Sequence, residues 1–165
     1  MSEQRASLYD APVVAHIVRS GFVESVHHGS VVALDANGST LLAIGDVSGP
    51  IFPRSSSKPI QALAMLRGGL DLDGELLALA TGSHSGEAFH LEGVQRILTG
   101  AGLSEQDLQN TPDLPYGALE HDAWIAAGRA PTSVAQNCSG KHAAMLATCI
   151  AAGWDTATYR DPDHP

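Results

Sequence analysis

The sequence has few cysteines and no long apolar stretch. Only two of its 165 residues are cysteines, at positions 138 and 149, too few for the disulfide framework of a small secreted domain. If both lie on one helix, about 16 Å separates them, and no disulfide can form between them. No segment approaches the ~20 consecutive apolar residues of a membrane-spanning helix. The first ten residues carry charges and no apolar run, unlike a signal peptide. We therefore expect a cytoplasmic protein with no membrane partner.

Positive charge is also scarce. Nine Lys and Arg residues stand against 18 Asp and Glu residues, a formal net charge of −9, and lysine occurs only at positions 58 and 141. Nucleic acids and anionic membranes bind proteins through concentrated basic charge, which this sequence does not contain. We therefore expect no nucleic-acid partner, and a small-molecule substrate instead.

The remaining composition is that of a folded domain. Hydrophobic residues make up 44% of the chain and charged residues 16%, enough apolar material for a packed core. The first third contains apolar, β-branched runs, and Asn37-Gly38 between two of them is a hairpin signal. These runs predict an antiparallel β-meander, followed by a loop over residues 46–53. The predicted strands are 13–19, 22–27, 31–34 and 40–44.

After residue 55 the apolar spacing becomes helical. Strands first and helices afterwards indicate an α+β domain rather than alternating βαβ units. The longer predicted helices begin near Ser55 and span 73–80, 87–98 and 140–152, and shorter ones cover 104–108 and 121–127.

The segment Arg54-Ser55-Ser56-Ser57-Lys58-Pro59 is the first candidate site. Ser55 and Lys58 are three residues apart, so on a helix they share a face. A lysine amine that has lost its proton can accept the proton of a serine nucleophile. The alternative is a serine-rich helix start with a solvated lysine.

The segment from Gly82 to Glu87 lies between two predicted helices. It approaches the nucleophile elbow G-x-S-x-G, but the central residue is His84, which excludes the standard elbow. His84 can be a general base, and the alternative is a loop whose Ser85 caps the next helix.

Asn137-Cys138-Ser139-Gly140-Lys141-His142 forms the third candidate site. The P-loop pattern fails, because position 135 is alanine and position 142 is histidine. Cys138 and Lys141, again three apart, can face one metal ion. The alternative is a buried cysteine at a helix start.

In this order, the segments resemble the bacterial L-asparaginase II family of the Rhizobium type. The resemblance runs from about residue 12 to residue 165 and rests most on R-S-S-S-K-P-I-Q and N-C-S-G-K-H. It implies the serine β-lactamase/glutaminase-like α+β fold and hydrolysis of L-asparagine to L-aspartate and ammonia. The other segments that carry it are R-S-G-x-x-E-x-x-H-H-G, S-H-S-G-E and Y-R-D-P-D-H-P.

The resemblance also implies residue roles. Ser55 corresponds to the nucleophile, Lys58 to its base and Ser83 to a second active-site serine. Cys138 and Lys141 correspond to two ligands of a zinc ion that tunes substrate binding. Family members are longer, so residues 1–165 would form the N-terminal half of one domain, with an incomplete zinc site and weak or no activity alone. A homodimer is expected by the same analogy.

Two alternatives stay open at this stage. The chain can be a zinc-binding or regulatory module without turnover, or another amidase such as a glutaminase or a β-lactam-directed enzyme. The S-x-x-K spacing is shared by those amidases and does not separate them, although the strings S-D-N and K-T-G are absent.

Overall fold

The computed structural model describes residues 11–165, so the prediction about the first ten residues lies outside the described part. The chain divides into two compact units, one ending at Phe52 and one spanning Pro53–Pro165. Each unit is described by itself. Together they contain strands and then helices, which confirms the α+β class.

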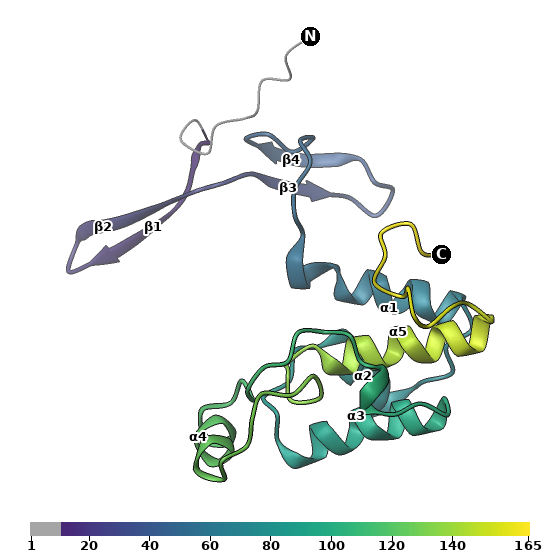
Figure 1. Ribbon diagram of the computed structural model, residues 1–165. Coiled ribbons are helices and arrows are strands. Elements are labelled where there is room, and N and C mark those ends of the chain that lie inside the picture. The colour runs from purple at the N-terminus through teal and green to yellow at the C-terminus, as the bar shows by residue number, and fades with distance from the viewer. Residues whose placement is uncertain (1–10) are drawn as a thin grey trace. The chain divides into compact units, whose positions relative to one another are not determined.

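The first unit contains two antiparallel hairpins (Figure 1). Strands β1 (Val13–Arg19) and β2 (Phe22–His28) pair up to Arg19 and Phe22. Between them Ser20 and Gly21 have φ of 50° and 77°. Two consecutive residues with positive φ form the type I′ turn, whose twist matches that of the paired strands. The Arg19-Ser20-Gly21 segment thus builds a tight hairpin.

The second hairpin pairs β3 (Val31–Leu34) with β4 (Thr40–Ile44). The Asp35 carboxylate closes its turn by accepting hydrogen bonds from the N–H groups of Asn37 and Ser39, each at 2.8 Å. The hairpin predicted at Asn37-Gly38 is therefore confirmed.

The predicted meander is wrong in one connection, because β2 and β3 do not pair within residues 11–52. The N–H of Gly29 donates to the carbonyl of Pro12, which prolongs the β1–β2 pairing beyond the end of β2. The chain then runs on from β2 into β3 instead of reversing (Figure 1). Two separate hairpins result.

The second unit is helical. Its central element is α5 (Ser139–Ala152), which packs against α1, α2 and α3. The other elements are the 3-10 helix η2 (Arg54–Ser57), α1 (Lys58–Arg67), α2 (Gly74–Thr81), α3 (Ala88–Gly100), the 3-10 helix η3 (Glu105–Asp107) and α4 (Ala118–Ala126).

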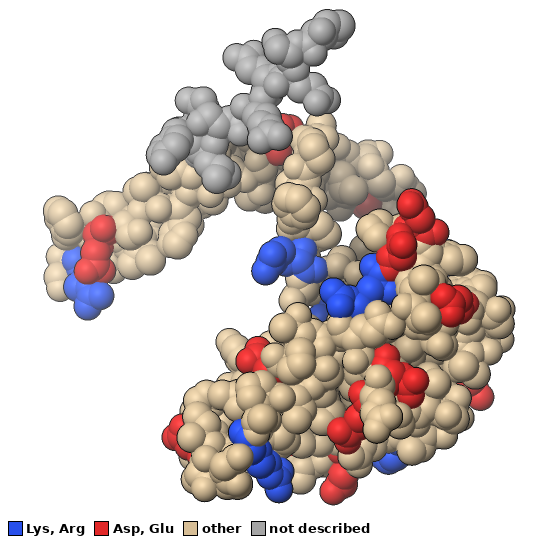
Figure 2. Space-filling model, in the orientation of Figure 1, with Lys and Arg blue, Asp and Glu red and all other residues tan. Residues whose placement is uncertain are grey.

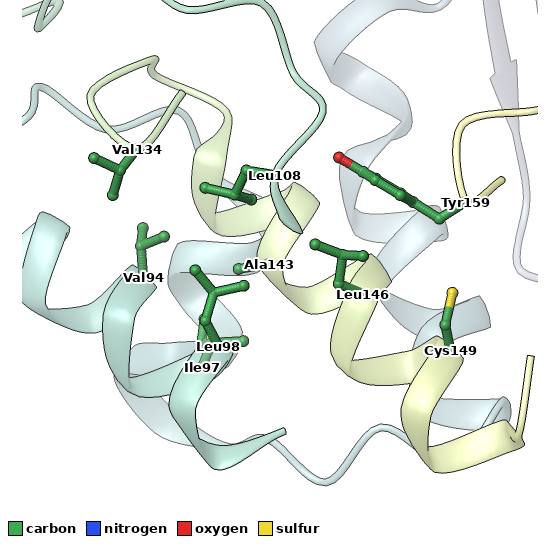
Figure 3. Packing of buried hydrophobic residues seen from close by; sticks show 9 residues of the cluster. All are labelled: Val94, Ile97, Leu98, Leu108, Val134, Ala143, Leu146, Cys149 and Tyr159. Carbon is green, nitrogen blue, oxygen red and sulfur yellow. The ribbon is translucent and has the colours of Figure 1, made fainter. Parts of the chain in front are cut away.

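Two groups of buried side chains surround α5. Figure 3 shows the larger group, in which Val94 and Leu98 of α3 face Ala143 and Leu146 of α5. The smaller group includes Met65 of α1 and Ala144 of α5. Helix α5 therefore presents apolar residues to both sides, as expected of a central helix.

The close contact between α2 and α5 depends on a glycine. A Cβ atom at Gly140 would lie 2.7 Å from the Leu79 carbonyl oxygen, closer than real Cβ contacts. Any side chain here would force the two helices apart. Gly140 thus sets the spacing where the last turn of α2 meets the start of α5.

Cys138 precedes the first residue of α5 and Cys149 lies inside the helix, and both are free thiols. This confirms their predicted placement along one helix. Within residues 11–165 no helix combines the length and apolar character needed to cross a membrane.

Candidate functional site

The Lys58 side chain is buried and binds the loop that follows α2. Lys58 begins α1 and is only 4% exposed. Its Nζ donates to the Gly82 carbonyl oxygen at 2.5 Å and to the Ser83 hydroxyl oxygen at 2.8 Å. The fold thus brings together two of the predicted catalytic residues, Lys58 and Ser83, from separate segments.

Ser55 lies one turn before Lys58 but belongs to an exposed 3-10 helix. The backbone N–H of Lys58 donates to the Ser55 carbonyl, while the hydroxyls of Ser56 and Ser57 donate to the Pro53 and Arg54 carbonyls. Among the contacts of the described residues, the Ser55 hydroxyl forms no hydrogen bond to Lys58. The Lys58 amine is therefore directed to Ser83 rather than to Ser55.

His84 follows Ser83 and is buried, with 4% exposure. Its backbone N–H donates to the Asn137 carbonyl at 3.0 Å, and its Nε2 lies 2.8 Å from the Ser139 hydroxyl oxygen. Burial, followed by the nearby His90 and Lys58, lowers the pKa of His84 to about 4. The ring is therefore neutral at physiological pH and joins the Ser83 loop to the start of α5.

The Ser85 hydroxyl donates to the Glu87 carboxylate at 2.8 Å instead of capping the following helix. Glu87 is the residue before α3, and no side chain caps that helix end. The predicted cap at Ser85 is therefore wrong, because the carboxylate two residues later competes for its hydroxyl.

A cleft of about 560 Å³ lies beside Ser83, between α2 and α3. His90 of α3 stacks on His84 in its wall, with ring centroids 5.3 Å apart. Apolar side chains from both helices and polar groups from the loop share the lining, as in many small-molecule sites. The lining residues are Glu75, Leu76, Ala78, Leu79, Gly82, Ser83, His84, Phe89, His90, Glu92, Gly93 and Arg96.

The predicted zinc ligands lie at the start of α5. Cys138 is the residue before the first turn, and its side chain makes no capping hydrogen bond to the helix; Lys141 lies in that turn. The Cys138 thiol donates to the Asn137 side-chain oxygen at 3.1 Å. Across residues 11–165, no three His, Cys, Asp or Glu side chains come together as a metal-binding group. A structural zinc site takes four ligands, so these two donors do not fit a complete one.

The half-buried His142 makes a second histidine contact that the sequence patterns did not reveal. Its Nδ1 lies 3.0 Å from the Tyr159 hydroxyl, which also accepts the N–H of Gln109 at 2.9 Å. Burial, followed by the charges of Lys141 and Arg160, lowers the pKa of His142 to about 4. His142 and Tyr159 each belong to one of the segments that resemble the family, which was the available signal. That signal did not indicate that the two residues contact each other.

A comparison with protein families matches residues 15–165 to L-asparaginase II. The chain belongs to the L-asparaginase II family. The match covers the Lys58–Ser83 pair, the cleft and the start of α5, and it confirms the resemblance seen in the sequence. Membership in this family indicates an amidohydrolase acting on a small-molecule amide. A comparison with curated proteins found no significant match.

Proposed function

We propose that this L-asparaginase II family member hydrolyses the side-chain amide of L-asparagine to L-aspartate and ammonia. The observation that carries the proposal is the buried Lys58 amine, 2.8 Å from the Ser83 hydroxyl and one turn after Ser55. A buried amine between two serine-bearing segments supplies a base within reach of hydroxyl groups, as serine–lysine catalysis requires.

The proposed reaction begins with attack by the Ser55 hydroxyl oxygen on the amide carbon. In this proposal Lys58 is the base: the Ser55 proton passes to its amine and, through Ser83, to the nitrogen that leaves as ammonia. A water molecule then attacks the resulting ester, giving its proton to Lys58, and aspartate leaves as the Ser55 hydroxyl is restored. Ser83 acts as the proton relay, because it alone of the two serines contacts the Lys58 amine.

The remaining expectations follow from the family as further parts of the proposal. The fold is that of the serine β-lactamases and glutaminases, residues 1–165 represent its N-terminal half, and the protein acts as a cytoplasmic homodimer. Zinc, when bound, would supply a fixed positive charge at Cys138 and Lys141. Two donors do not complete its coordination, so we assign no step of the reaction to the metal.

Ammonia release from L-asparagine tests the nucleophile, measured on this chain and on any longer protein that contains it. We expect Ser55→Ala to lower kcat by at least about 10³-fold, since removal of a nucleophile disables the whole catalytic unit. Ser56→Ala is the matched control, because Ser56 lies in the same 3-10 helix and bonds only to a backbone carbonyl. An undiminished rate in Ser55→Ala would transfer the nucleophile role to another residue.

Ser83→Ala separates the relay from the nucleophile. Loss of a proton-transfer group lowers rates by about 10²–10⁴-fold, and acyl-enzyme can still form slowly. We therefore expect mass spectrometry to detect substrate bound to Ser55 in Ser83→Ala and none in Ser55→Ala. Covalent substrate on Ser83 itself would reverse the two roles.

A zinc-binding module without turnover is the second candidate, and the exposure of Ser55 favours it. Metal analysis of the purified chain distinguishes it from the enzyme. Stoichiometric zinc that is lost in Cys138→Ala, together with no ammonia release, would support the module. Glutamine supplied beside asparagine tests the glutaminase alternative in the same assay.

A further inference from the structure

We propose that His84 is a positioning residue that holds Ser83 against Lys58 by anchoring the Ser83 loop to Ser139 of α5. The inference rests on the proposed function for its catalytic consequence. Its structural basis is the pair of hydrogen bonds that His84 makes to the segment on either side of Cys138.

The proton positions in this contact follow from the Ser139 hydroxyl. That hydroxyl has one proton and donates it to the Val134 carbonyl at 2.7 Å. It must therefore accept from His84, so the imidazole carries its proton on Nε2. The histidine is a donor here and is fixed in one tautomer.

The other ring nitrogen is left without a partner. His84 Nδ1 is buried and makes no hydrogen bond within the part of the chain that the structure describes. A buried acceptor without a donor is unfavourable, which means that packing and the Nε2 bond hold the ring in place against that penalty. The hydrogen bond that Nε2 donates to Ser139 therefore explains why a histidine occupies this position.

The geometry transmits this anchor directly to Ser83. Ser83 is covalently joined to His84, and its neighbour Gly82 shares the Lys58 amine with it. The backbone bond from His84 to Asn137 and the tight packing of Gly140 on Leu79 leave little freedom at the same junction. Loss of the Nε2 bond would release the side of the loop that faces α5 and let the Ser83 hydroxyl move away from Lys58.

Two substitutions of His84 separate positioning from simple space-filling. In H84Q the side-chain amide can place an N–H donor near the position of Nε2, whereas the shorter side chain of H84N cannot reach Ser139. We expect H84N to lower kcat for asparagine by about tenfold, the equivalent of one hydrogen bond, with KM changed less than about twofold. H84Q should recover most of the loss. Equal kcat values for H84N and H84Q would overturn the proposal.

Ser139→Ala removes the same bond from its other end and leaves the ring intact, so it gives the answer if H84N does not fold. We expect the same loss of kcat. Thr148→Val is the matched control, because Thr148 is also a buried α5 residue whose hydroxyl donates to a backbone carbonyl, but it does not contact His84. Thr148→Val should keep the kcat of the original chain. An unchanged kcat in Ser139→Ala overturns the proposal.

Amide hydrogen exchange provides a readout that needs no catalysis. The His84 N–H is bonded to the Asn137 carbonyl, so we expect it to exchange about tenfold faster in Ser139→Ala, while Val94 of α3 keeps its rate. If neither this chain nor a longer protein that contains it hydrolyses asparagine, the proposed function fails and this measurement still decides the anchor. Unchanged exchange at His84 would show that Ser139 does not hold the loop.

Discussion

Lys58 is one of two lysines in the chain, and its aliphatic stem and amine are both removed from water. Its amine bonds to a carbonyl and a hydroxyl, and within residues 11–165 it forms no ion pair with a carboxylate. A buried amine without a counter-charge is a poor source of stability. A gain in folding stability therefore does not explain its position, whereas the proposed role as a base would.

This leads to opposite expected effects of Lys58→Met on stability and on activity. Methionine fills a similar space without charge, so the thermal midpoint of unfolding should stay the same or rise. Asparagine hydrolysis should fall by about 10²–10⁴-fold through loss of the base. Lys58→Arg should not rescue it, since a guanidinium does not give up its proton. Calorimetry and ammonia release check both effects, and a large drop in the midpoint for Lys58→Met would contradict the assignment.

His84 predicts a pH dependence of stability. Its pKa is about 4 in the folded protein against 6.5 for an ordinary histidine, so between these values the unfolded chain binds the proton that the folded chain does not. The free energy of unfolding should therefore fall as the pH drops from 6.5 to about 4. Urea denaturation at about pH 7 and about pH 4.5 measures this. In H84Q the fall should be smaller, and parallel losses in the two proteins would refute the contribution of His84.

At the residue scale the sequence predicted which segments matter but not how they meet. The S-x-x-K spacing singled out Lys58, the Gly82–Glu87 segment singled out His84, and the family resemblance singled out Ser83. The local rule that residues three apart on a helix face each other led to the pairing of Ser55 with Lys58. The amine instead reaches Ser83 across a tertiary contact, which no spacing within a segment can indicate.

At the scale of elements, the junction of α2 and α5 governs the site. The last turn of α2 leads into the loop that carries Ser83, and the first turn of α5 carries Ser139. Gly140 lets the two approach so closely that Leu79 lies against its Cα hydrogens. Any change in this spacing is therefore expected to displace the Ser83 loop.

Gly140→Ala tests the junction against a matched control. The added methyl would lie 2.7 Å from the Leu79 carbonyl oxygen, so we expect a loss of about 1–3 kcal/mol in the free energy of unfolding. Gly100→Ala adds the same methyl to α3, where no atom lies within 4 Å, and should stabilise the helix by up to about 1 kcal/mol. Urea denaturation measures both, and equal effects would mean that the contact is not tight.

Element positions were the most predictable part of the fold. The helices at 87–98 and 140–152 were predicted from apolar periodicity and were found as Ala88–Gly100 and Ser139–Ala152. Three strands, 13–19, 31–34 and 40–44, have the predicted bounds. Strand pairing was less predictable, because the Gly29 N–H after β2 bonds to Pro12, a residue before β1, and no local sequence signal indicates that contact.

At the scale of the whole molecule, the two compact units differ in what they bury. Every residue of β1 and β2 is exposed, whereas both groups of buried apolar side chains belong to residues 53–165. Acidic side chains are spread over the visible face of the helical unit, and basic ones form only small groups there (Figure 2). The boundary after Phe52 falls in the segment that the sequence predicted to be a loop, so the division is consistent with the predicted elements.

Residues 53–165 should therefore fold without the hairpins. We expect the isolated segment to show the same helical circular dichroism signal that these residues contribute in the full chain. We also expect it to unfold in one cooperative transition. Leu146→Ala in the same segment should lower the free energy of unfolding by about 2–5 kcal/mol, because Leu146 of α5 is fully buried in the apolar group that α5 shares with α3. A broad, non-cooperative transition of the unmutated segment would show that the hairpins are needed.

Gly82 and Ser83 hold the amine of Lys58, one of only two lysines in the chain. Opening of this contact can therefore be followed by chemical labelling of lysine. Apart from the terminal amine, an acylating reagent has two possible targets, Lys58 and the more accessible Lys141. Acylation of a lysine needs a free electron pair and space around the nitrogen, and Lys58 has no such space while the loop is closed on it. The labelling rate of Lys58 relative to that of Lys141 therefore reports how often the Ser83 loop opens. Peptide mass spectrometry can measure both rates on the chain without any substitution.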